Sequence, residues 1–96
     1  MNKIEFLYSL LEVAISKANP KECVPPFLPK KIPGKLVVLG AGKASAAMAR
    51  VVEKHYTKNI EGLVVTRYEH AVLCREIEIV EAGHPIPDKN GVLVAN

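Results

Sequence analysis

The fold is decided by one stretch of the sequence, Leu36-Val37-Val38-Leu39-Gly40-Ala41-Gly42-Lys43-Ala44-Ser45. Its four consecutive apolar residues are typical of a buried strand in a parallel sheet. Gly40 and Gly42 allow the backbone to turn sharply and leave amides uncovered. The residues that follow, as far as Tyr56, have the spacing of a helix, and the start of a helix favours an anion. The stretch therefore predicts a strand, a glycine turn and a helix that bind a phosphate or a carboxylate, with the charge of Lys43 at the same place.

Before this stretch, apolar residues recur at helical spacing from residue 3 to about 19, where Pro20 ends the pattern. Phe6, Leu10 and Val13 widen the apolar side, so we expect a helix that packs on the sheet and is buried on more than one flank. Residues 20–35 contain five of the seven prolines and predict an extended connector.

After the glycine turn, a helix is expected over residues 43–56, with Arg50, Glu53 and Lys54 on its solvated side. Residues 62–66 and 77–82 read as two further strands, parallel to the first, and residues 90–96 as the first turns of a helix. The fold class is α/β: a Rossmann-like, mainly parallel sheet with flanking helices. Because only three strands are predicted, we expect residues 36–96 to be the βαβ core of an incomplete piece of a larger domain.

Composition excludes several classes of function. The 96 residues are 49% hydrophobic and 24% charged, as in a soluble globular protein, and the net charge is only +3. The basic residues are dispersed and aromatic residues are few, which argues against a nucleic-acid partner. No apolar run is long enough for a membrane span, and Glu5 and Glu12 interrupt any signal peptide. Cys23 and Cys74 have no metal-binding spacing, so we expect reduced thiols, a cytoplasmic location and no metal site in this segment.

Three phosphate-binding patterns can be compared with the glycine turn. A Walker A loop fails, because Val37 and Ala44 stand where it requires glycine and a hydroxyl residue. A dinucleotide loop would need an acidic residue at the end of the second strand, which instead ends in Thr66-Arg67, so NAD is disfavoured. The simpler pattern of strand, GxGK and helix fits throughout. It predicts that Gly40, Gly42, Lys43, Ala44 and Ser45 cradle one phosphoryl or carboxylate group, with Arg67 at the same sheet edge.

Three blocks of the sequence, in order, resemble the class II glycerate 2-kinases, a family often labelled hydroxypyruvate reductases. The first block is Gly40–Ala49, the second is Gly62–Thr66 with Arg67, Tyr68 and His70, and the third is Glu81–Asp88. Together they lie within residues 36–91. Glu69 departs from the family, which more often has glycine there. Members of the family continue through a further Gly/Ser-rich loop into a second domain, so the resemblance identifies residues 1–96 as an N-terminal fragment.

The resemblance implies an ATP- and Mg²⁺-dependent kinase that converts D-glycerate to 2-phosphoglycerate. In such a kinase Lys43 would be the catalytic residue that neutralises charge near the transferred phosphoryl group, and Arg67 would be a second cation. His70 and His84 are candidate acid–base groups, although the prolines after His84 favour a role in shaping its loop. His55 is expected to meet solvent or cap the helix end. Asp88 is expected to cap the helix that follows it.

Two other functions remain open. A phosphosugar-binding module, similar to sugar isomerase domains, would use Ser45 as its phosphate contact without turnover. An NADPH-dependent hydroxypyruvate reductase is the second, since Arg67 could accept a 2′-phosphate. Whichever holds, we expect the isolated chain to be inactive, because the family's active site lies between two domains. We also expect it to associate with itself through an exposed sheet edge.

Overall fold

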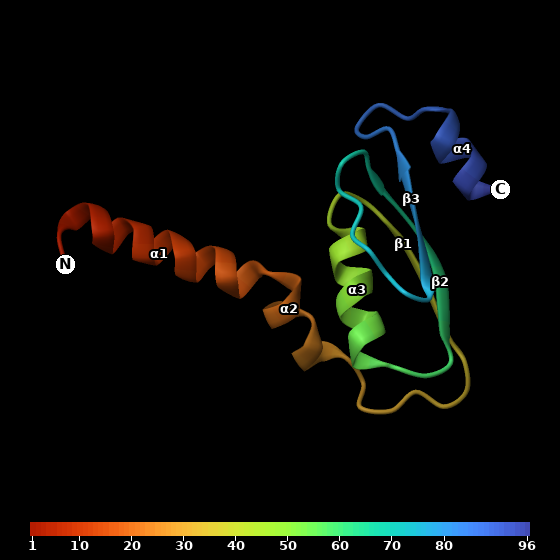
Figure 1. Cartoon of the computed structure of the whole chain (residues 1–96), viewed down its shortest axis with the longest axis horizontal. Coiled ribbons are helices and arrows are strands. Elements are labelled where there is room, and N and C mark those ends of the chain that lie inside the picture. Colours follow the sequence, from red (N-terminus) through yellow and green to blue (C-terminus); the bar gives the residue numbers. More distant parts are fainter.

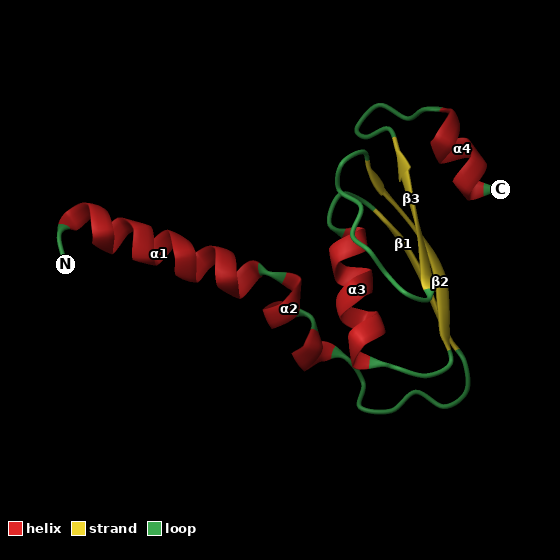
Figure 2. Cartoon of the chain, in the orientation of Figure 1, coloured by secondary structure: helices red, strands yellow, loops and turns green.

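Three parallel strands form the sheet in the order β1-β2-β3, as the computed structural model of all residues, 1–96, shows (Figure 1, Figure 2). The strands are β1 (Leu36–Ala41), β2 (Ile60–Arg67) and β3 (Ile77–Ala82). Val38 stands opposite Gly62, which in turn stands opposite Ile77. The α/β fold with a parallel sheet is thus confirmed, and the middle strand is longer than the sequence predicted.

Strands β1 and β2 approach each other closely at Gly62. A Cβ atom on this residue would lie 2.1 Å from the carbonyl oxygen of Val38. That is far inside van der Waals contact, so β1 and β2 can be neighbours at this point only because residue 62 has no side chain.

Two helices lie on opposite faces of the sheet (Figure 1). Helix α3 (Ser45–His55) packs on all three strands, and Ala49 joins Ile60, Val64 and Ile77 in the buried core. Helix α4 (Lys89–Ala95) packs on β3 from the opposite side (Figure 1). The side chain of Asp88 accepts hydrogen bonds from the backbone N–H groups of Asn90 and Gly91, at 3.2 and 3.3 Å. This confirms the predicted cap.

Glu53 is not on the solvated side of α3, contrary to expectation. Only 2% of its surface is exposed, and its carboxylate accepts hydrogen bonds from the backbone N–H groups of Arg75, Glu76 and Ile77, at 2.5, 2.8 and 3.0 Å. Burial works to raise the pKa of this carboxyl, but the three N–H donors and the charge of Arg75 outweigh it and hold the pKa below its usual value. Glu53 therefore fixes the segment that enters β3.

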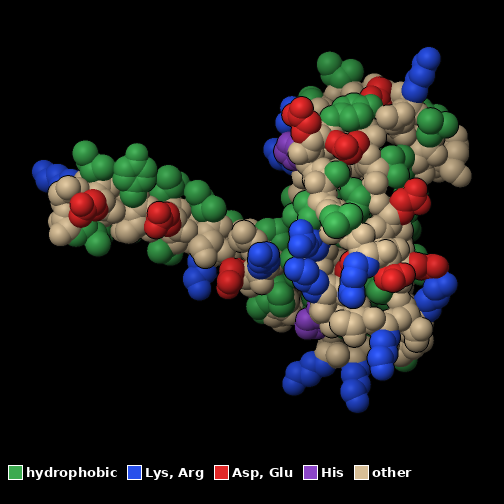
Figure 3. Space-filling model, viewed as in Figure 1, with side chains coloured by type: hydrophobic (Ala, Val, Ile, Leu, Met, Phe, Trp, Pro, Cys, Tyr) green, Lys and Arg blue, Asp and Glu red, His purple; other side chains and the backbone are tan.

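The first helix does not pack on the sheet, so that expectation is wrong. Helix α1 (Lys3–Ala18) projects from the rest of the chain as an arm (Figure 1) and has no buried residue. At about 100° per residue, its apolar side chains span an arc of roughly 220°. Figure 3 shows hydrophobic side chains along the arm, with charged ones at intervals. No helix is long and apolar enough to cross a membrane.

The connector between α1 and β1 determines the direction in which α1 projects. Residues 20–27 are not extended as predicted: they form helix α2 (Pro20–Cys23) and the 3-10 turn η1 (Pro25–Phe27). A proline is compatible with the first turn of a helix, where its missing N–H would have no partner. Tyr56, at the end of α3, donates its hydroxyl hydrogen to the carbonyl of Pro29. The connector is therefore held at the far end of α3, and α1 leaves from there, away from the sheet.

Candidate functional site

The glycine loop lies at the carboxyl end of β1, where α3 begins (Figure 1). Gly40 is still within β1, opposite Val64 of β2. Gly42 has a φ of +125°, in the region that side chains disfavour, so glycine is required for this turn. Lys43 and Ala44 follow it and are exposed. The predicted loop residues are thus consecutive along one tight turn.

Two contacts fasten this turn to β2. The N–H of Gly42 donates to the carbonyl of Val65 at 3.1 Å. The hydroxyl of Ser45 lies 2.9 Å from the same carbonyl oxygen and 2.6 Å from that of Gly42. Its proton is therefore directed at backbone carbonyls, and Ser45 holds the loop in shape.

The start of α3 presents uncovered backbone donors. Within the turn, the N–H of Ser45 donates to Gly42 and that of Met48 to Ala44, both at 3.1 Å. Four N–H groups of the turn and of the first residues of α3 have no acceptor in the chain, those of Lys43, Ala44, Ala46 and Ala47, and of these residues Lys43 and Ala44 are exposed. A hollow of about 470 Å³ lies between this loop, β1 and α3. Lys43 forms no salt bridge, since the two in the structure join Lys35 to Glu61 and Arg75 to Glu53. The arrangement can bind an anion.

A second loop, at the carboxyl end of β2, contacts the glycine loop. Nη1 of Arg67 lies 3.5 Å from Nε2 of His70, and Nδ1 of His70 lies 3.3 Å from the carbonyl oxygen of Lys43. The structure therefore brings Arg67 and His70 to the predicted loop. His84 is exposed in another loop, and His55 is exposed at the opposite end of α3. Neither has a hydrogen bond to the glycine loop.

The far side of this second loop is tied to the segment before α4. Tyr68 donates its hydroxyl hydrogen to Asp88 at 2.5 Å, and the side-chain amide of Asn90 donates to Tyr68 at 3.0 Å. The hydrogen bond to Asp88 raises the pKa of Tyr68, and the same bond lowers the pKa of Asp88. Glu69 has a φ of +69°, and its N–H donates to the carboxylate of Glu81. The left-handed backbone explains why glycine is expected at this position.

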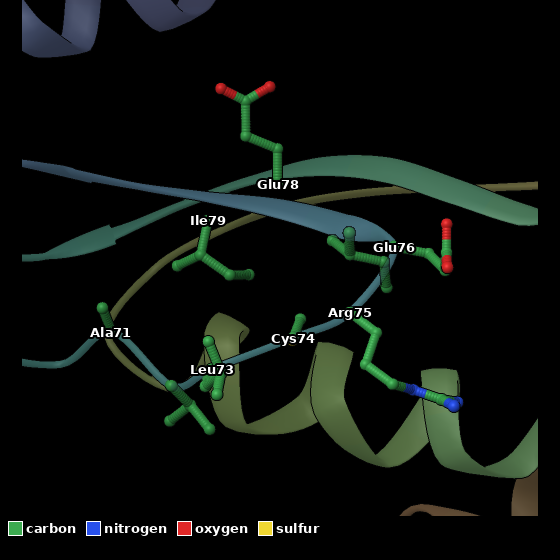
Figure 4. Close-up of a pocket in the computed structure, with 9 residues that line it drawn as sticks. Ala71, Leu73, Cys74, Arg75, Glu76, Glu78 and Ile79 are labelled. Atoms are coloured by element: carbon green, nitrogen blue, oxygen red, sulfur yellow. The ribbon is translucent and has the colours of Figure 1, made fainter.

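A larger hollow, of about 550 Å³, lies along β3 and the segment that precedes it (Figure 4). Ile79 points from β3 toward the segment with Leu73 and Cys74, whereas Glu78 points the other way. Burial, together with the charge of Glu53, raises the pKa of Cys74, which keeps the thiol protonated. No predicted site residue lines this hollow. No group of three His, Cys, Asp or Glu residues in the chain could hold a metal ion.

Sequence reasoning missed Thr66. Only 2% of its surface is exposed, and its hydroxyl lies 3.5 Å from the carbonyl oxygen of Lys43. A hydroxyl residue that ends a run of buried apolar residues was the available signal, because a buried hydroxyl needs a partner.

The chain has relatives in several microorganisms. A protein of Agrobacterium vitis, whose name assigns it provisionally to the hydroxypyruvate reductases, is 45% identical over 92 residues, which are 95% of this chain and 21% of that protein. The D-glycerate 2-kinase of Thermotoga maritima is 34% identical over 85 residues, 86% of this chain and 20% of that enzyme. A crystal structure of a Pyrococcus horikoshii OT3 protein matches with a TM-score of 0.82 and 32% identity, over 99% of this chain and 24% of that one.

The chain spans about a fifth of the length of these two named relatives. The family model described as "Domain of unknown function (DUF4147)" matches residues 6–96, almost the whole chain. With a glycerate 2-kinase among its homologues and a parallel sheet that a solved relative shares, the chain is a member of the DUF4147 family.

Proposed function

We propose that the chain supplies the phosphate-binding loop of an ATP-dependent glycerate 2-kinase, which converts D-glycerate to 2-phosphoglycerate. One observation carries the proposal: the uncovered N–H groups of Lys43 and Ala44 lie beside a hollow at the carboxyl end of a parallel strand. Ligands of open α/β sheets collect at this edge. The name of the Thermotoga relative supplies the substrate.

Each predicted site residue has a role in this proposal. Lys43 is the catalytic residue, because its free ammonium group can neutralise charge on the transferred phosphoryl group. Gly40, Gly42, Ala44 and Ser45 form the turn whose backbone receives the phosphate. Arg67 approaches from β2 and adds a second positive charge at the same edge.

ATP and Mg²⁺ are the cofactors that this function implies. The free N–H groups of the turn fit the phosphates of a nucleotide. Magnesium is bound through oxygen ligands, carboxylates above all, and the chain has no acidic cluster that fits this requirement. These residues therefore have no role in holding the metal in this proposal.

Lys43→Ala tests the proposed role of the loop. In a titration of the ¹⁵N-labelled chain with inorganic phosphate, we expect saturable shifts of the amide signals of Lys43 and Ala44. Lys43→Ala should weaken phosphate binding about fivefold or more, the loss expected for a charge-assisted contact. Lys54→Ala, another exposed lysine farther along α3, is the matched control and should bind phosphate normally. Equal binding by both variants would contradict the proposal.

Residues 1–96 are, in this proposal, the N-terminal part of the kinase, made of helix 1–19, connector 20–35 and core 36–96. A kinase must surround both substrates and exclude water, whereas the glycine loop here is open to solvent. We expect no turnover by this chain in a coupled ADP-release assay with glycerate, ATP and magnesium. Glycerate-dependent ADP release by a purified monomer would contradict this placement of the active site.

The reductase names among the relatives support one second candidate, an NADPH-dependent hydroxypyruvate reductase. Arg67 at the end of β2 is the residue that would accept the 2′-phosphate. Saturable quenching of NADPH fluorescence, lost in Arg67→Ala, would favour this function. Phosphate binding without NADPH quenching would favour the kinase.

Self-association through the sheet edge is also part of the proposal. β1 is an edge strand, and its apolar residues Val37 and Leu39 are 54% and 77% exposed. Unpaired strand edges with apolar side chains favour pairing with another chain. We expect oligomers in size-exclusion chromatography, and a monomer at all concentrations would contradict this. With nucleotide and metabolite substrates, we expect the protein to be cytoplasmic.

A further inference from the structure

We infer that Thr66 and His70 are positioning residues that orient the Lys43–Ala44 peptide group, so that the N–H of Ala44 faces the anion site. This inference rests on the proposed function. It concerns two residues at the end of β2 that were not among the predicted ligands of the anion.

Both side chains meet one atom, the carbonyl oxygen of Lys43. The hydroxyl of Thr66 approaches it to 3.5 Å and Nδ1 of His70 to 3.3 Å. Thr66 is buried and His70 is half-buried, so their surroundings restrict both donors. The backbone N–H of His70 donates to the carbonyl of Arg67 at 3.0 Å, which closes the turn that carries the ring.

The orientation of this carbonyl determines that of the next amide. In a trans peptide group, the C=O of one residue and the N–H of the next point in opposite directions. When Thr66 and His70 hold the oxygen of Lys43 toward β2, the N–H of Ala44 points away from β2. This N–H is one of the four without an acceptor in the chain. The two side chains thus fix a donor before any anion arrives, so binding need not reorganise it.

The same contact fixes which ring nitrogen of His70 is the donor. A carbonyl oxygen only accepts, so Nδ1 of His70 carries a hydrogen. In the neutral ring Nε2 is then an acceptor, and it faces Nη1 of Arg67 at 3.5 Å. His70 therefore links the Arg67 guanidinium to the glycine loop. The bonds of Tyr68 to Asp88 and of Glu69 to Glu81 hold the other side of this loop.

The test is to remove the two donors separately and to measure the carbonyl itself. In the ¹³C,¹⁵N-labelled chain without ligand, His70→Ala and Thr66→Val should each shift the ¹³C signal of the Lys43 carbonyl, since a hydrogen bond to its oxygen is lost. His70→Asn should restore the signal, because the asparagine amide can replace Nδ1 as the donor. His84→Ala is the control, because it removes an exposed histidine that also lies near the carboxyl ends of the strands. An unchanged Lys43 carbonyl in His70→Ala and Thr66→Val would overturn the inference.

A phosphate titration of the same samples separates this inference from the proposed function. We expect His70→Ala to weaken phosphate binding about fivefold, as for one lost hydrogen bond, and His70→Asn to recover it. If the unaltered chain shows no phosphate-dependent shifts, the proposed function fails, while the carbonyl signal still decides the orientation. If the carbonyl moves but phosphate binds equally well to every variant, a role of His70 in anion binding is excluded.

Discussion

Helices α1 and α3 differ in how much of their side-chain surface is buried, and their sequences do not predict this difference. Helix α3 has 11 residues and buries Ala46, Ala49 and Glu53, whereas α1 has 16 residues and buries none. In α1 large apolar residues such as Leu7 and Leu11 are 62% and 53% exposed. Small residues let α3 lie close to the strands, and the apolar arc of α1 is too wide for a single partner surface. Apolar spacing therefore predicts that a helix forms, but not what covers it.

The core depends on the close contact between β1 and β2, whereas the arm α1 does not. A substitution at Gly62 should therefore have the largest effect on the free energy of unfolding. Gly62→Ala places a Cβ 2.1 Å from the carbonyl oxygen of Val38, and neither backbone can move without breaking the sheet. We expect a loss of about 3 kcal/mol or more in the free energy of unfolding, measured by urea denaturation. Gly91→Ala is the matched control, because nothing lies within 4 Å of its added Cβ. A Gly62→Ala chain as stable as that control would contradict this account of the core.

Glu53 is a second difference between the two helices, because α3 buries this acidic residue whereas α1 buries no residue. Glu53→Gln should lower the free energy of unfolding by about 2 kcal/mol, because the amide has a single acceptor oxygen. Its NH₂ group is itself a donor and leaves at least one of the three backbone N–H groups without an acceptor. The pKa of Glu53 is lowered in the folded state, so the stability it adds is present above the unfolded pKa and is lost as the pH falls through the folded value.

Urea denaturation between pH 7 and pH 3 measures this dependence. The Gln variant should show a weaker decline than the original chain. Glu12→Gln, an exposed acidic residue of α1, should leave the slope as it is. Parallel curves for the original chain and Glu53→Gln would show that this carboxylate is not the group that titrates.

Glu69→Gly should increase the stability of the fold, by less than the two preceding substitutions lower it. At a φ of +69° a side chain costs about 1 kcal/mol that glycine avoids, and the backbone N–H still reaches Glu81. The melting temperature should rise slightly. Glu78→Gly, in the extended backbone of β3, should lower it instead. If both variants lower the melting temperature, the positive φ of Glu69 is not a source of strain.

The smallest effect on the core should come from the arm. Leu7→Glu combined with Leu11→Glu leaves the core contacts intact, so its free energy of unfolding should change by less than about 0.5 kcal/mol. The oligomers expected through the β1 edge should persist in size-exclusion chromatography, because neither residue belongs to β1. Ser16→Glu, on the polar stripe of α1, should leave the oligomers unchanged. A large loss of core stability in the double variant would mean that the arm packs on the sheet after all.

The strands, the glycine turn and α3 could be predicted because each rests on neighbouring residues. Short apolar runs, a pair of glycines and helical spacing are local features, and the structure confirmed them. The position of α1 could not be predicted, since its apolar residues do not specify a partner. Glu53 was read as solvated because its backbone partners, from Arg75 onward, are more than twenty residues away along the chain.

Some features of the candidate site could likewise be predicted from the sequence, and others could not. The uncovered amides beside Lys43 follow from the glycine turn, and the sequence placed Arg67 at the same edge. The contacts of Thr66 and His70 converge on a backbone carbonyl, an atom that every residue has. No pattern of side chains in the sequence indicates which backbone carbonyl these two residues will contact. Only the parallel register of β1 and β2 brings these residues together.

The carboxylate of Glu53 also has a consequence for the order of events in folding. The three N–H groups it binds all belong to the segment that enters β3, while Glu53 itself is on α3. The bonds join groups more than twenty residues apart, so we expect them to form late, when β3 joins a βαβ unit that already exists. We therefore expect Glu53→Gln to accelerate unfolding and to leave the folding rate nearly unchanged in stopped-flow kinetics, the behaviour of a contact that forms after the transition state.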